Sequence, residues 1–172
     1  MPEASGLPND SHVIVVGKFE LDPPLNPELE QTTHWSAIGD KGILKKIYYS
    51  TDSKPVELDT DISFSQWQKQ IEVMWNQLFF VKAEAKKTYL NGGIIYLDMV
   101  EQSRIWFPGG LYFDPPPGAK AIYIGTIHFT RNDFWVIKRV QVIDDYSEAN
   151  KVFKKQFASE ATLKKVLLQK VN

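Results

Sequence analysis

Apolar and polar residues alternate in two runs near the C-terminal end of the chain, at 121–129 and 134–143. In the first run both alternating faces carry apolar side chains, as expected for a strand that is covered on two sides. The segment 130–133 between the runs, TRND, supplies turn-forming residues. The pattern predicts a β-hairpin within a core.

Other segments also predict strands. Residues 12–21 (HVIVVGKFEL) form a β-rich run that ends at Asp22-Pro23-Pro24, and 42–51 form a second run. Around 78–97, strand-like alternation surrounds Asn91-Gly92-Gly93, which predicts a tight hairpin turn. Between 63 and 77 the apolar residues follow helical spacing, so a short internal helix is one interpretation and an all-strand reading is the other.

The two ends of the chain differ from the middle. Residues 1–11 contain proline, glycine and serine, which predicts a flexible lead-in. Near the other end, Asp144, Asp145 and Ser147 precede apolar residues at helical spacing, and Ser159 begins a second such run. The prediction is therefore a mainly β, two-sheet β-sandwich over 12–146, with a helical segment at 147–172 packed on it.

Composition limits the classes of function. The 172 residues suit one domain, and a formal net charge of −1 argues against nucleic-acid binding, which needs a basic surface. The absence of cysteine excludes disulfides, thiolate catalysis and cysteine-ligated metals. No apolar run reaches the ~20 residues of a membrane span, and the first residues do not resemble a signal peptide. We therefore expect a location in the cell envelope, in the periplasm or at the outer membrane, if a leader has been removed, and a cytoplasmic location otherwise.

No motif in the sequence nominates a metal or a cofactor. His12, His34 and His128 lack the spacing of a zinc site, and no phosphate loop, dinucleotide fingerprint or nucleophile elbow is present. The pair Asp144-Asp145 is placed either to cap a helix or to act as an acid. We favour capping and expect no catalytic residue, metal or cofactor.

Aromatic residues crowd a segment rich in glycine and proline, 104–118, which predicts a loop. The candidate binding residues in it are Trp106, Phe107, Tyr112 and Phe113. Exposed aromatic side chains give a large contact area at low entropic cost, so this loop is a candidate surface for a protein or a glycan. The alternative interpretation is that these rings plug the open end of a sandwich.

Several runs resemble those of small bacterial cell-envelope lipoproteins that have an immunoglobulin-like or prealbumin-like β-sandwich. They are YIGTI at 123–127, RNDF at 131–134, VIDDY at 142–146, and FFV and YLNG at 79–81 and 89–92. The resemblance implies a non-catalytic, envelope-associated binding or structural module. The lipid-bearing cysteine of such proteins is missing from this sequence, so membrane contact would need a lipid anchor absent from this chain.

Two alternatives belong to other classes of function. One is a carboxylate-dependent hydrolase acting on glycans, with Asp114, Asp144 or Asp145 in a cleft beside the aromatic segment. The other is a cytosolic adaptor that pairs through a strand edge or its helix.

Overall fold

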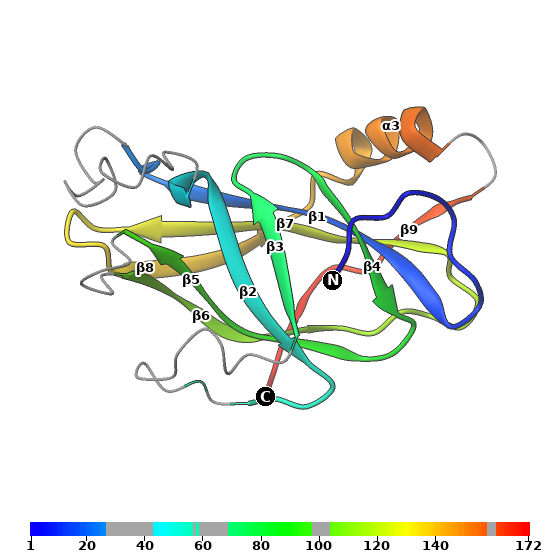
Figure 1. Cartoon of the computed structure of the whole chain (residues 1–172), viewed down its shortest axis with the longest axis horizontal. Helices are drawn as coiled ribbons and strands as arrows, with labels where there is room; N and C mark the ends of the chain where they lie inside the picture. The colour runs from blue at the N-terminus through cyan, green and yellow to red at the C-terminus, as the bar shows by residue number, and fades with distance from the viewer. Residues whose placement is uncertain (27–42, 57, 59–68, 98–103, 158–160) are drawn as a thin grey trace.

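The computed structural model describes residues 1–26, 43–56, 58, 69–97, 104–157 and 161–172. The strands form two sheets that face each other (Figure 1). One sheet has the order β4-β1-β7-β8, with β9 added to β7, and the other has the order β10-β6-β5-β2-β3. The predicted mainly β, two-sheet sandwich is confirmed.

The elements of the first sheet and its covering helix are β1 His12–Asp22, β4 Phe79–Glu84, β7 Ala121–Arg131, β8 Ile137–Ile143, β9 Leu163–Lys165 and α3 Tyr146–Phe157. The elements of the second sheet and its short 3₁₀ helix are η1 Ile43–Lys45, β2 Lys46–Asp52, β3 Gln70–Met74, β5 Thr88–Tyr96, β6 Arg104–Phe113 and β10 Gln169–Lys170.

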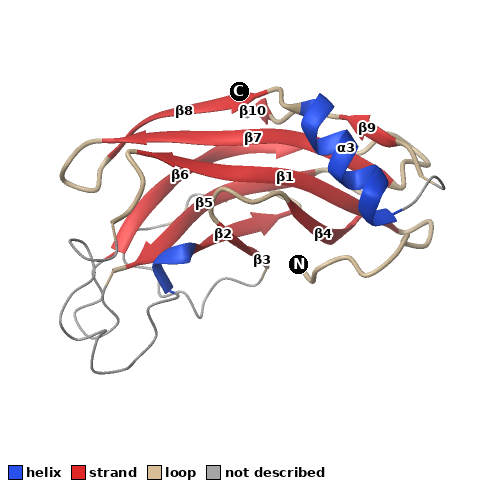
Figure 2. Ribbon diagram, turned by 90° about the horizontal axis from the view of Figure 1, so that it is seen from above, coloured by secondary structure: helices blue, strands red, loops and turns tan. Residues whose placement is uncertain are grey.

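Two hydrophobic clusters hold these layers together. The larger one fills the space between the sheets, where Phe19, Tyr49 and Phe129 stack with ring centroids 5.2–6.3 Å apart. The second lies on the outer face of the first sheet, where Ala149 and Phe153 of α3 are fully buried. Figure 2 shows α3 crossing this face. Because β1 and β7 are covered on both sides there, both alternating faces of their sequences are apolar.

The hairpin predicted at 121–143 is confirmed, since β7 and β8 pair antiparallel. Its turn lies at 132–136 and not at the predicted 130–133, because Thr130 and Arg131 still pair with β8. The second strand is shorter than expected, because 134–136 belong to the turn. The strand predicted at 12–21 is also confirmed, and it pairs parallel with β7.

The helical prediction for the end of the chain is only half right. Helix α3 forms, but Leu163–Lys165 and Gln169–Lys170 are strands. The physical reason lies in β7, whose residues 121–124 are left unpaired by β8. Leu163–Lys165 pairs parallel with 121–123, and the backbone of Val166 and Leu168 then donates to Tyr123 and Ile124. Pairing these buried peptide groups outweighs the local helical period.

Two further predictions need correction. Residues 70–74 form β3, so the internal helix is wrong there and the all-strand reading holds, while 59–68 lie outside the described residues. Asn91-Gly92-Gly93 is not a turn but the bulged middle of β5, and the reversal before β5 falls at 85–87.

The start of the predicted lead-in is packed against the sandwich. Glu3 bridges Val81 of β4, the backbone of Ala4 donates to Phe80, and the Ala4 side chain is buried. The edge of β4 is covered in this way, because an open strand edge has unpaired backbone groups that need partners.

Candidate functional site

The four aromatic residues predicted to form a binding loop lie on a strand. They belong to β6, so the loop prediction for 104–113 is wrong. Strand alternation sends Phe107 and Phe113 into the core, at 2% and 1% exposure. Trp106 and Tyr112 face the other way and are half-buried. The structure thus separates two core residues from two surface residues.

A bulge between β5 and β6 fixes the position of Trp106. The register shifts between Leu90 and Gly92, which pair with Leu111 and Pro108. At Gly109 a β-carbon would lie 2.2 Å from the backbone of Asn91, so only glycine fits this close approach. The buried Tyr49 hydroxyl donates to the Pro108 carbonyl from the core side, which ties the bulge to the sandwich.

Large apolar side chains are exposed where β7 turns into β8. Phe134 is 82% exposed, Val136 48% and Trp135 37%. These three residues and Trp106 border an open hollow of about 530 Å³. We call Arg104, Trp106, Phe134, Trp135 and Val136 the aromatic end. The sequence prediction had placed 134–136 in a strand. The signal for their exposure was available, since three large apolar residues directly follow a polar turn segment.

The turn that presents these side chains is held by hydrogen bonds. The Asn132 side-chain oxygen accepts from the backbone N–H of Phe134 at 2.9 Å and of Val136 at 3.0 Å. The Asn132 backbone N–H donates to the Val136 carbonyl at 3.0 Å. Trp135 has a positive φ of 62°, an unfavourable backbone conformation for a bulky residue. Strain of this kind is found where a loop must hold a side chain in a set place.

Cationic side chains surround the aromatic end. The Arg104 guanidinium lies 4.8 Å from the Trp106 ring centroid, a cation–π contact. Lys138 and Arg139 follow on β8 and are exposed, and Asp133 in the turn is an acid. Among the described residues of the aromatic end and the hairpin segment 132–139, positive charge predominates.

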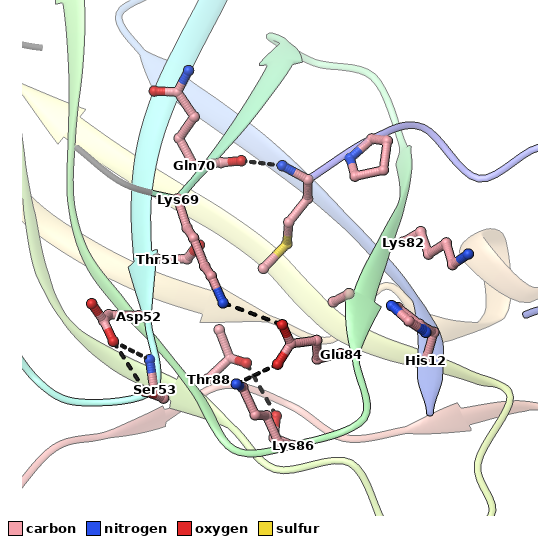
Figure 3. Close-up of a pocket in the computed structure, with 13 residues that line it drawn as sticks. His12, Thr51, Asp52, Ser53, Lys69, Gln70, Lys82, Glu84, Lys86 and Thr88 are labelled. Atoms are coloured by element: carbon pink, nitrogen blue, oxygen red, sulfur yellow. Dashed lines mark hydrogen bonds and ion pairs between the residues drawn. The ribbon is translucent and has the colours of Figure 1, made fainter. Parts of the chain in front are cut away.

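A second cleft, of about 420 Å³, opens at the other end of the sandwich, between β3 and β4 (Figure 3). Glu84 lies between two lysines there, 3.2 Å from the Lys69 ammonium and bonded to that of Lys86. Hydrogen bonds from Lys86 and Lys69 hold the pKa of Glu84 below its usual range. The buried Thr51 hydroxyl, which also lines this cleft, has no hydrogen-bond partner among the described residues. Glu84 is thus paired with two of the lysines that line this cleft.

The acid pair Asp144-Asp145 has structural partners at the start of α3. An Asp144 carboxylate oxygen accepts from the Tyr146 N–H at 3.1 Å, and the other lies 2.7 Å from the Lys165 ammonium. Asp145 accepts from the Thr126 hydroxyl at 2.8 Å. The hydrogen bond from Lys165 lowers the pKa of Asp144. The preferred interpretation, helix capping, fits these contacts.

The remaining predicted side chains are dispersed. Asp114 is exposed just past the end of β6. His128 lies 3.2 Å from Glu20 on the outer face of the first sheet, and His12 contacts Ser11 and Asn9. His34 lies outside the described residues. Within the described part of the chain, no three histidine or acidic side chains gather as metal ligands would.

Comparison with known proteins found no matching family model, no similar curated protein and no similar solved structure. In the described part of the chain, no helix has the length and apolar character needed to cross a membrane.

Proposed function

We propose that this protein is a non-catalytic binding module and that its contact surface for a protein partner is the aromatic end. The observation that carries the proposal is the exposure of Phe134, Trp135 and Val136 on a turn that Asn132 holds in place. Folded proteins rarely fix three adjacent large apolar side chains toward solvent without a partner to cover them.

The composition of the surface favours a protein over a glycan. Tryptophan and arginine are enriched among residues that dominate protein interfaces, and both occur here as Trp106 and Arg104. A sugar also needs polar groups to bond its hydroxyls. The amide of Asn91, which lines the hollow, already bonds the backbone of Lys54 and Val56.

Envelope association remains part of this proposal through the resemblance to envelope lipoproteins. The glycan hydrolase is the weaker alternative, because Asp144 and Asp145 bond neighbouring residues of the fold.

The test is selection of binders from a random peptide library of about 12 residues, displayed on phage, against the folded protein. We expect selected peptides to lose at least about tenfold in affinity for Phe134→Ser, since such a contact acts as an interface hot spot. Val152→Ser on α3 is the control, because Val152 is also an exposed apolar residue, at 37%. Peptides that bind both variants as tightly as the wild type would refute the proposal.

A further inference from the structure

We propose that the cleft between β3 and β4 is a second binding site, which takes a small molecule bearing a carboxylate or a phosphate group. The bound oxyanion lies between Lys69 and Lys86, where the Glu84 carboxylate lies in the free protein, and accepts a hydrogen bond from the Thr51 hydroxyl. The described residues that line this cleft are all different from those that line the hollow at the aromatic end. The two sites can therefore be tested separately, and either proposal can fail alone.

Thr51 brings a buried hydroxyl without a partner to this cleft. It continues the inner face of β2 after Ile47 and Tyr49, which are fully buried between the sheets. Its side chain lines the cleft and is 2% exposed, and its hydroxyl bonds none of the described residues. A buried polar atom without a partner destabilises a fold. A ligand that supplies the missing partner is a reason for a protein to retain such an atom.

Ion pairs cross the mouth of the cleft beside Thr51 (Figure 3). Glu84, at the end of β4, lies 3.2 Å from the ammonium of Lys69, which precedes β3, and it also bonds the ammonium of Lys86. The Thr51 backbone N–H donates to the Lys69 carbonyl at 3.0 Å, so these two residues are neighbours across β2 and β3. One carboxylate thus serves two ammonium groups next to a free hydroxyl.

A ligand can replace the Glu84 carboxylate in these contacts. The side chains of Lys69, Lys86 and Glu84 are 46–54% exposed, and exposed ion pairs contribute little to stability. Hydrogen bonds from the two lysines keep the pKa of Glu84 low, so an ionised oxyanion is the group that this site already holds. Glu84 leaves the Thr51 hydroxyl unbonded, whereas a free oxyanion can bond the hydroxyl and both ammonium groups.

The charge and the size of the cleft both favour a small anion. Its described lining contains three lysines and two acids. The ammonium of Lys82 has no partner among the described residues. The second acid, Asp52, accepts hydrogen bonds from the backbone N–H groups of Ser53 and Lys54 in its own turn. The volume of about 420 Å³ lies within the range of small-molecule sites.

The deciding experiment is an NMR titration of the isotope-labelled protein with succinate and, separately, with sodium phosphate, in about 0.15 M NaCl at constant pH. We expect saturable shifts of the amide signals of Thr51, Lys69, Glu84 and Lys86, and none at 132–136. The anion with the lower dissociation constant identifies the group that the natural ligand bears. No saturable shift at these four residues with either anion up to about 20 mM would overturn the proposal.

Charge variants test whether Glu84 and the ligand compete. Glu84→Gln should bind the anion at least about threefold more tightly, because its carboxylate no longer occupies the lysines, and Lys69→Met should bind at least about tenfold more weakly. Glu72→Gln is the matched control, since Glu72 on β3 lies 2.8 Å from the Lys46 ammonium but does not line the cleft. If Glu84→Gln binds no more tightly than Glu72→Gln, the proposal is wrong.

Thr51→Val tests the hydroxyl itself, because valine keeps the shape of the side chain and removes its polar atom. Without ligand, the variant should melt no lower than the wild type, since an unpartnered buried atom is lost. It should bind the anion at least about fivefold more weakly. A hydroxyl with a purely structural role would give the reverse result, a lower melting temperature with unchanged affinity, and this would overturn the proposal.

Discussion

Phe107→Ala and Trp106→Ala should have very different effects on stability, although the two residues are neighbours on β6. Phe107 is 2% exposed, and its ring centroid lies 4.8 Å from that of Phe129 and 5.3 Å from that of Trp75. Trp106 is half-buried on the opposite face, where the Arg104 guanidinium lies 4.8 Å from its ring centroid.

The expected magnitudes follow from these surroundings. Removing a buried phenylalanine ring from a packed core lowers the free energy of unfolding by about 3–5 kcal/mol. Removing Trp106 loses a surface cation–π contact of about 0.5–1 kcal/mol and part of its burial, so we expect a total below about 2 kcal/mol. For a domain of this size, the Phe107 variant should melt roughly 6–20 °C below the wild type.

Urea unfolding followed by circular dichroism is the assay, because it does not depend on the tryptophan that is removed. The slope m should be the same for both variants, so that the midpoints compare stabilities directly. Equal losses for the two variants, or a loss below about 1 kcal/mol for Phe107→Ala, would refute the assignment of Phe107 to the core and Trp106 to the surface.

Three other variants test separate parts of the structure. Asn132→Ala should lower the free energy of unfolding by only about 1 kcal/mol in urea unfolding, because water can replace its exposed hydrogen bonds. The same variant should bind the selected peptides much more weakly. Unchanged peptide affinity would show that the turn keeps its conformation without the Asn132 hydrogen bonds. Gly93→Ala should destabilise by about 1–3 kcal/mol, because its β-carbon would lie 2.5 Å from the buried Tyr49 ring; Gly6→Ala, where no atom lies within 4 Å, is the control in the same unfolding assay. Burial raises the pKa of Glu20, but hydrogen bonds from Lys18 and His128 outweigh it and hold the pKa below its usual value. The stability from Glu20 is therefore present above about pH 4 and is lost as the pH falls through its folded pKa, so Glu20→Gln should destabilise at pH 7 and have little effect near pH 3; an equal loss at both pH values would contradict this linkage.

The alternation of apolar and polar residues was sufficient to predict the fold class and the best-defined strands. In the segment of β7 both faces are apolar, and this pattern correctly indicated a strand covered on two sides, while the β-rich run at 12–21 correctly indicated the strand β1. A turn after β7 was predictable as well, although it lies at 132–136 and not at 130–133, since asparagine and aspartate favour reversals through bonds to their own backbone. Such signals are local, and each needs only the residues within one segment.

The errors arose where a distant strand decided the local conformation. Residues 163–170 have a helical period, yet 163–165 form a strand on the edge of β7 at 121–123, and 169–170 form a strand on β6. Gly92 and Gly93 have the composition of a tight turn, yet they lie in a bulge where Tyr49 and Pro108 approach closely. The residues within either segment do not indicate which distant residues will pack against them.

In the candidate site, too, some features follow from the sequence of one segment and others only from packing between distant segments. The sequence by itself determined that aromatic residues are abundant near 104–113 and that no catalytic or metal motif accompanies them. The tertiary structure alone decided which rings are available, because strand alternation and the packing of two sheets bury Phe107 and Phe113 and leave Trp106 at the surface. It also brings the turn residues 134–136 beside Trp106, since the sheets bring β6 and β8 together from distant parts of the chain.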